Sequence, residues 1–243
     1  MTPKRYLRAP LKSLGFAAGV AAGAYAAYAG VAWSRYGRVS PPRPEEQDPL
    51  LDRFMPEYEV AERHHIRVAA PAAMTLAAAQ ETDLQAAPLV RTIIRAREVI
   101  LGAAPDDRPR PRGLLREVEA LGWGLLAEVP GHEVVVGAVT RPWEANVTFR
   151  ALPPDQFATF SEPGYVKIAW TLRAEPIGPS DSIFRTETRA IATDPPARAQ
   201  FRRYWSLFSP GIILIRWTIL NPVKAAAERR AQTGGNGEHG GNG

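Results

Sequence analysis

The sequence predicts an α+β protein, in which one antiparallel sheet is covered by a long C-terminal helix and preceded by a transmembrane helix. Three observations predict this class. Residues 14–33 carry no charged side chain. Between residues 123 and 192, apolar and polar side chains alternate with a period of two, in segments separated by turns rich in Gly and Pro. After residue 195 the apolar residues recur at helical spacing instead.

The N-terminal part consists of a basic segment, residues 1–13, followed by an apolar segment, residues 14–34. About 20 helical residues cross the ~30 Å hydrocarbon of a bilayer, so we expect a membrane anchor through residues 14–33. A cleaved signal peptide, with Ala27-Tyr28-Ala29 as its processing site, is the alternative. Basic residues are more numerous before the segment than after it, which favours a single-pass cell-membrane protein with its domain outside the cytoplasm.

Three glycines of this segment, Gly15, Gly19 and Gly23, are spaced four residues apart on one helical face. Because glycine has no side chain, a second helix can approach this face closely, which indicates a possible homodimer. An Ala/Gly-rich helix also produces such spacings by chance, so both interpretations stay open.

The distribution of charge excludes several classes of protein. The pI is near 9.7, but residues 1–44 hold seven basic and no acidic residues, and the remainder is close to neutral. The domain therefore lacks the concentrated positive charge that nucleic-acid binding requires. The chain has no cysteine, which excludes disulfides, thiol catalysis and thiolate metal sites. We expect no nucleic-acid partner, no metal and no cofactor.

Residues 35–56 form a Pro-rich linker, in which Pro41-Pro42-Arg43-Pro44 precedes two glutamates. This composition is typical of an extended spacer, so we expect it to run free rather than pack. The folded domain is expected over residues 57–230. Residues 231–243 become rich in Gly and Asn, which predicts a disordered tail.

The first half of the domain predicts one strand and three helices. Tyr58–Val68 contains β-branched and aromatic residues and predicts a strand. Pro71 opens a helix over 72–80, and apolar residues at helical spacing predict a second over 88–101. Alternating Pro and Arg over 105–113 predict a mobile loop before a short helix at 114–121.

The second half predicts an antiparallel meander that buries one face. Its strands are expected at residues 123–129, 132–140, 146–151, 165–174 and 182–192, with a helical turn at 153–160. In the last strand the face bearing Phe184 should point inward, because the other face carries Arg185, Glu187 and Arg189. We expect those charges to pair on a solvated face, and a buried acid with its partners is the alternative.

The chain ends in a helix that begins at Pro195-Pro196 and must cover the sheet. Its apolar stripe comprises Phe201, Tyr204, Trp205, Phe208, Ile212, Ile215 and Ile219. Pro210-Gly211 is expected to kink or break it, because proline removes one helical hydrogen bond.

This order of elements over residues 57–222 resembles the helix-grip fold of the SRPBCC superfamily, which includes the START and birch-pollen-allergen-like proteins. The stretches 162–170, 186–189 and 192–194, followed by Phe201-Arg-Arg-Tyr-Trp205, are similar to those of uncharacterised bacterial members. The resemblance implies a hydrophobic ligand bound between a curved sheet and the long helix. No catalytic motif of the enzymes in that superfamily is present, and the anchor departs from their usual soluble form.

We expect this chain to bind a hydrophobic small molecule or lipid in a cavity between sheet and helix. The residues expected to line it are Val136, Phe149, Ile168, Trp170, Phe184, Trp205 and Phe208. A filled core is the alternative. The alternative functions are a cyclase-like or hydrolytic enzyme that uses Glu187, His65 or Arg185, and a non-catalytic interaction module.

Glu62 and His64 lie on one face of the first expected strand, with His65 on the other. Two such groups are too few for a metal site, which needs three or four ligands. We expect no catalytic residue and no metal ligand among them.

Overall fold

The computed structural model describes residues 8–83, 86–104 and 111–238, and the surroundings of side chains from residue 19 to residue 233. The loop expected at 105–113 therefore lies largely outside the described residues. The elements, in chain order, are α1 (Arg8–Arg35), η1 (Pro44–Glu46), α2 (Pro49–Asp52), β1 (Val60–Val68), α3 (Ala72–Glu81), α4 (Pro88–Leu101), α5 (Leu114–Ala120), β2 (Gly124–Val129), β3 (Glu133–Thr140), β4 (Phe149–Arg150), α6 (Pro154–Thr159), β5 (Val166–Pro176), β6 (Ser182–Ala192) and α7 (Pro195–Glu238).

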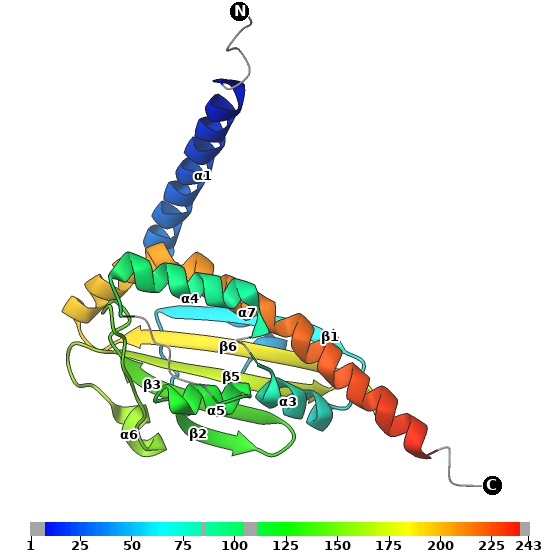
Figure 1. Cartoon of the computed structure of the whole chain (residues 1–243). Helices are drawn as coiled ribbons and strands as arrows, with labels where there is room; N and C mark the ends of the chain where they lie inside the picture. Colours follow the sequence, from blue (N-terminus) through cyan, green and yellow to red (C-terminus); the bar gives the residue numbers. More distant parts are fainter. Residues whose placement is uncertain (1–7, 84–85, 105–110, 239–243) are drawn as a thin grey trace, which may run out of the picture.

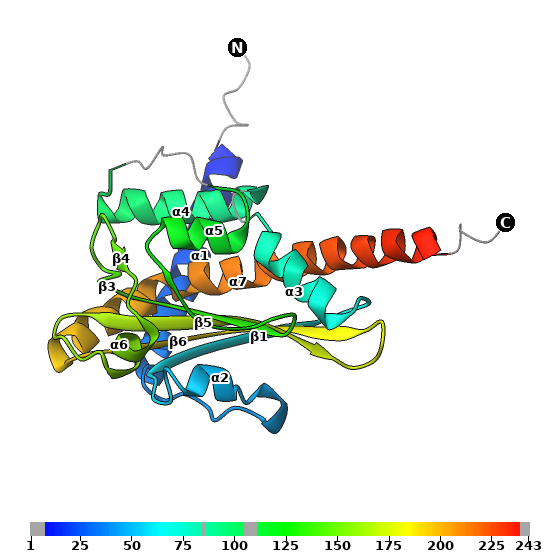
Figure 2. The ribbon, with the colours of Figure 1, turned by 90° about the horizontal axis from the view of Figure 1, so that it is seen from below.

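Within the described residues, six strands form one antiparallel sheet in the order β1-β6-β5-β3-β2, and the short β4 pairs with β3. The first strand, β1, forms one edge of the sheet and pairs with the last strand, β6, from Val60 opposite Ala190 to Val68 opposite Ser182. The sheet is curved, and α7 lies across one face together with α3, α4 and α5 (Figures 1 and 2). The predicted α+β class, a helix-grip arrangement of a curved sheet on a long C-terminal helix, is confirmed.

The C-terminal helix α7 is continuous, so Pro210-Gly211 does not break it, and in Figure 1 the helix changes direction between its yellow-orange start and its red end. Buried side chains hold the helix to the sheet on both sides of the proline, among them Phe201 before it and Val223 after it. Burial of such side chains offsets the hydrogen bond that proline removes. Gly211 serves a different purpose, because a Cβ there would lie 2.8 Å from Cγ2 of Ile93 on α4. The glycine lets α4 pack closely on α7.

Helix α7 also extends to Glu238, beyond residue 231 where the tail was expected to begin. The run before this end is rich in Ala and Arg, both good helix formers, and an existing helix adds one hydrogen bond for each further residue. The first residues of the expected tail, 231–238, thus form the end of this helix, and residues 239–243 lie outside the described part.

The segment expected to be a free linker packs on the sheet face opposite α7, where Figure 2 shows α2. Leu51 and Met55 are buried, and Asp48 accepts a hydrogen bond from the Leu51 N–H at 2.8 Å, which caps α2. The prediction of an unpacked spacer is wrong here, because the segment supplies apolar side chains to a second core. That core comprises Leu51, Phe54, Met55, Leu126, Val135, Val139, Phe157 and Ala169.

The sheet therefore buries both faces, and the predicted solvated charge pairing around Glu187 is wrong. Arg189 is 1% exposed and Glu187 is 5% exposed. The Arg189 guanidinium donates to Glu187 at 2.8 Å, to Asp52 at 2.5 Å and to the Met55 carbonyl at 2.8 Å. A buried arginine of this kind persists because its donors are matched by acceptors. Through these hydrogen bonds Arg189 joins the α2 segment to β6.

Helix α1 contacts α7 through its C-terminal half and then projects away from the body (Figure 1). The Tyr28 hydroxyl lies 3.0 Å from Oγ of Ser209, and Arg202 donates to the Trp33 carbonyl at 2.9 Å. Among the described residues, Pro195–Thr233 of α7 is a helix long and apolar enough to cross a membrane, a test that core helices also pass. Because α7 covers the sheet, we assign it to the core.

Candidate functional site

Two apolar clusters lie between the sheet and α7. The first contains residues of four strands and the second half of α7, among them Val68, Val136, Trp170, Leu172, Phe184, Ile219 and Val223. The second lies under the first half of α7 and comprises Tyr36, Val60, Val166, Ala190, Phe201 and Tyr204, with Ile168, Trp205, Phe208 and Ile212 packed against it. The interface is thus apolar at both ends.

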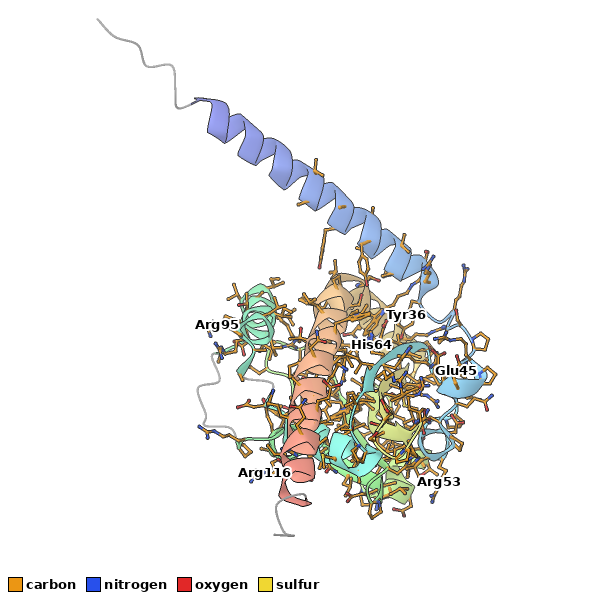
Figure 3. The ribbon with its side chains drawn as sticks, turned by 90° about the vertical axis from the view of Figure 1, so that its right-hand side faces the viewer. Tyr36, Glu45, Arg53, His64, Arg95 and Arg116 are labelled. Atoms are coloured by element: carbon orange, nitrogen blue, oxygen red, sulfur yellow. The ribbon has the colours of Figure 1, made fainter. Side chains whose placement is uncertain are left out.

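A group of polar residues, here called the polar belt, separates these clusters: Glu62 and His64 of β1, Thr186 and Thr188 of β6, and Arg216 of α7. Residues directly opposite in antiparallel strands project to the same face, and Glu62 pairs with Thr188 as His64 pairs with Thr186. On α7, Arg216 follows Ile212 by four residues, so both face the sheet. Figure 3 shows His64 beside α7.

The belt is joined to aromatic rings as well as to its own members. The guanidinium carbon of Arg216 lies 5.1 Å from the centroid of the Trp170 ring, a cation–π contact. The imidazole of His64 lies 5.3 Å from the Trp217 ring, edge to face, and its Nε2 lies 4.0 Å from a Glu62 oxygen. Among the described residues, no carboxylate forms an ion pair with Arg216 within 4.0 Å.

Three buried polar atoms of the belt have no hydrogen-bond partner in the described part of the chain: Nε2 of His64, Oγ1 of Thr186 and Oγ1 of Thr188. Most buried polar atoms in folded proteins are hydrogen-bonded, and an unpaired one costs about 1–3 kcal/mol. Three such atoms on adjacent strands, facing one helix, form a site that can bind the polar group of a ligand.

Burial sets the charge of each ionisable member of the belt. It lowers the pKa of His64 to about 4, with a further contribution from Arg216, so the imidazole is neutral at pH 7. Burial also lowers the pKa of Arg216 to about 10, while Glu62 opposes the shift, so Arg216 remains a cation. Burial raises the pKa of Glu62, and the positive charge of Arg216 opposes this rise. The belt therefore presents a cation and a neutral imidazole beside the carboxyl group of Glu62.

Six of the seven residues expected to line a ligand site flank the belt. Val136, Trp170 and Phe184 belong to the first cluster, whereas Ile168, Trp205 and Phe208 pack against the second. The seventh, Phe149, lies on β4 and connects to the interface through Trp123, whose ring is 5.0 Å from Phe149 and 6.2 Å from Trp170.

The belt itself was not predicted as a site. From the sequence, Glu62 and His64 were weighed only as metal ligands, and no role was assigned to Arg216. The sequence did contain a signal for the belt: Arg216 is a charged residue at a sheet-facing position of the helix, and the first strand carries polar residues on its helix-facing side.

The residues suggested for an enzyme, Glu187, His65 and Arg185, lie on the opposite face of the sheet. There they line a hollow of about 20 Å³, room for about one water molecule. Its charges are paired, because Arg63 lies 3.0 Å from Glu187 and Arg185 lies 2.6 Å from Glu175. We assign this network to holding the α2 segment on the sheet.

A second hollow on that face has a volume of about 260 Å³ and opens to solvent between residues 54–57 and 158–161. Lys167 is one of its lining residues; burial lowers the pKa of this lysine, and its ammonium donates to the Ala158 carbonyl at 2.9 Å. That hydrogen bond connects β5 to the end of α6, which indicates a structural role.

The fold and the site together define a helix-grip α+β protein whose sheet–helix interface has apolar ends and a polar centre. No protein-family model and no curated protein matches the chain. Solved structures with similar folds include a point mutant of norcoclaurine synthase from Thalictrum flavum, bound to a transition-state analogue. It is 10% identical with a TM-score of 0.34, over 70% of this chain and 95% of that one.

Two further structures are similar at the same distant level. A hypothetical protein of Helicobacter pylori is 7% identical with a TM-score of 0.37, over 78% of this chain and 99% of that one. The Zhui aromatase/cyclase from Streptomyces sp. R1128 is 16% identical with a TM-score of 0.23, over 70% of this chain and 94% of that one. At these scores the similarity carries no argument about function, so the site must be judged by its own chemistry.

Proposed function

We propose that this protein is a membrane-anchored member of the SRPBCC superfamily that binds a hydrophobic molecule or lipid between the sheet and α7. The observation that carries the proposal is the polar belt between two apolar clusters. A ligand with an apolar body and a small polar or anionic group matches this division. Its apolar part would replace packed side chains of the clusters, and its polar group would meet the belt.

Each polar member of the belt has a function in this proposal. Arg216 attracts an anionic or strongly accepting group, because no carboxylate of the described residues pairs with it within 4.0 Å, and the nearby Glu62 acts on its charge only at longer range. The hydroxyls of Thr186 and Thr188 and the imidazole of His64 provide the remaining hydrogen bonds. In the free protein these buried polar atoms have no partner, which costs free energy. Binding would give them partners, and the removal of this cost would contribute to the affinity.

The anchor in this proposal is α1, through residues 14–33. Its contacts with α7 at Tyr28 and Trp33 support a retained helix rather than a cleaved signal peptide. A Cβ added at Gly19 or Gly23 would meet no atom within 4 Å, so this glycine face is open to the second helix of a homodimer. The surroundings of Gly15 lie outside the described part.

The test is to purify the full chain from membranes in mild detergent and to identify bound molecules by native mass spectrometry and organic extraction. We expect about one hydrophobic molecule per chain. Arg216→Gln should reduce its retention at least about tenfold, because a buried charge-assisted hydrogen bond contributes about 1.5–3 kcal/mol. Arg229→Gln is the matched control, because Arg229 lies on the same helix and is exposed.

The result against the proposal would be a folded wild-type chain that carries no molecule and takes up none from a total lipid extract. A second candidate function, an interaction module, would then be favoured, because most residues of the two clusters are closely packed and α7 exposes apolar side chains.

A further inference from the structure

We propose that the outer face of α7 lies on the surface of the bilayer, so that the polar belt is loaded directly from the membrane. This inference rests on the proposed anchoring of α1 and deepens the proposed ligand binding. It assigns a partner, a lipid surface, to one defined stripe of the molecule.

The stripe consists of Leu207, Leu214 and Trp217, which are 48%, 43% and 57% exposed. Spacings of seven and three residues place them on one side of the helix, and this side points away from the sheet. On the same side the sequence becomes polar or small after Trp217, beginning with Asn221. The apolar exposure is thus confined to about three turns of a helix that otherwise has a polar outer face.

Helix α1 contacts α7 at the start of this stripe. The Tyr25 hydroxyl donates to the Leu207 carbonyl, and Tyr28 contacts Ser209. Both tyrosines lie inside the uncharged run 14–33. A bilayer that surrounds this run as far as Tyr25 must therefore reach α7 at Leu207, where the stripe begins. Tyrosine is also a residue that favours the membrane–water interface.

The surroundings of the stripe suit a lipid surface. Arg35, Arg38 and Arg203 are exposed near the junction of α1 and α7, where they can meet lipid phosphates. Helix α4, which packs beside α7, exposes Val99 and Ile100 in its last turn. An amphipathic helix that lies in the interface combines these two features, an apolar face and basic residues next to it.

This position would connect the membrane with the ligand site. Trp217 is the last residue of the stripe, and its ring contacts His64 of the polar belt at 5.3 Å. A lipid that leaves the bilayer beside Trp217 would therefore meet the edge of the belt without crossing water. Movement of one exposed indole would open this route at the edge strand β1.

The absence of cysteine allows a direct test with the full chain in vesicles of phosphatidylcholine and phosphatidylglycerol. Three single-cysteine variants, Leu214→Cys, Ile177→Cys and Val20→Cys, are labelled with an environment-sensitive fluorophore. Ile177 lies in the β5–β6 turn and is 48% exposed, so it matches Leu214 in exposure but not in position. Val20 reports on the anchor. Quenching by lipids with a nitroxide near the headgroup is then measured.

We expect the label at position 214 to be quenched at least about threefold more than the label at 177, with a blue-shifted emission. Equal quenching at 214 and 177, while position 20 is protected from water-soluble quencher, would overturn the docking and leave the anchor intact. Exposure of position 20 to water-soluble quencher would refute the anchor. Protection of position 214 from both quenchers, in chains that crosslink as pairs, would assign the stripe to a second copy and overturn the inference.

Discussion

Thr188 and Thr171 are buried threonines on neighbouring strands, and they differ in one hydrogen bond. Oγ1 of Thr171 accepts from the N–H of Glu187 at 3.3 Å, whereas Oγ1 of Thr188 has no partner in the described part. An unpaired buried hydroxyl lowers stability, and removing one partner of a made hydrogen bond also lowers it. The same substitution at the two sites should therefore have opposite effects.

We predict that Thr188→Val raises the free energy of unfolding of the ligand-free chain by about 1 kcal/mol, and that Thr171→Val lowers it by about 1 kcal/mol. Chemical denaturation of both variants measures this difference. Thr188→Val should at the same time weaken retention of the proposed ligand, because the belt loses one of its polar atoms. A loss of stability in Thr188→Val would show that its hydroxyl already has a partner.

Glu133 lies on the face opposite the belt and is predicted to make stability depend on pH. Burial and a hydrogen bond with Asp48 raise the pKa of its carboxyl far above the ordinary range. The folded chain then keeps a proton that the unfolded chain releases. This contribution to stability is complete at acid pH, below the ordinary carboxyl pKa, and is lost as the pH rises toward the raised value.

Glu133→Gln, which keeps a donor toward Asp48 but does not titrate, should flatten this dependence. We expect the loss of unfolding free energy between about pH 5 and about pH 8 to be smaller in the variant than in the parent chain. Denaturation at several pH values measures it. Parallel profiles for the two proteins would place Glu133 in its ionised form throughout.

At the scale of the elements, the segment η1–α2 behaves as part of the core. Leu51 is fully buried against the sheet, whereas Leu125 on β2 is exposed. Leu51→Ala should lower the free energy of unfolding by about 2–5 kcal/mol, the usual cost of truncating a buried leucine. Leu125→Ala should change it by less than about 0.5 kcal/mol. Similar small effects in both variants would restore the interpretation of residues 35–56 as a spacer.

Local signals predicted most of the elements. Pro88 at a first helical position and Gly102 after the last turn, at φ 69°, mark both ends of α4, and the expected range agrees with the structure. The period of two likewise located β6. These signals act over a few residues, so they can be read without knowing the partners.

The burial of the second sheet face and the polar belt depend on distant partners. Arg189 looks solvated until Asp52 and the Met55 carbonyl are known to cover it. Arg216 likewise gains meaning only when α7 is placed over Trp170. A single sequence does not specify which charges meet across such separations, and for this reason the flanking apolar residues were predicted but the belt was not.

At the scale of the whole molecule, the apolar clusters on both faces share one sheet. We therefore predict that the chain unfolds in a single cooperative transition, apart from α1. Tryptophan fluorescence reports on the six tryptophans, among them Trp170 and Trp205 between the sheet and α7, and far-ultraviolet circular dichroism reports on all elements. The two transitions in denaturant should coincide. An early change in fluorescence, at unchanged circular dichroism, would show that α7 detaches from an intact sheet, because Trp170 and Trp205 pack between them.

The pairing of β1 with β6 also has a consequence for biosynthesis. At about 5–20 residues per second, the ribosome completes β6 on the order of ten seconds after β1. During this interval β1 has none of its native neighbours in the sheet, and its unpaired backbone is open to pairing with other chains. A nascent chain held at a membrane by its first helix would pass through this period separated from other unfinished chains. Chains released into solution would meet one another more often and would be more exposed to aggregation.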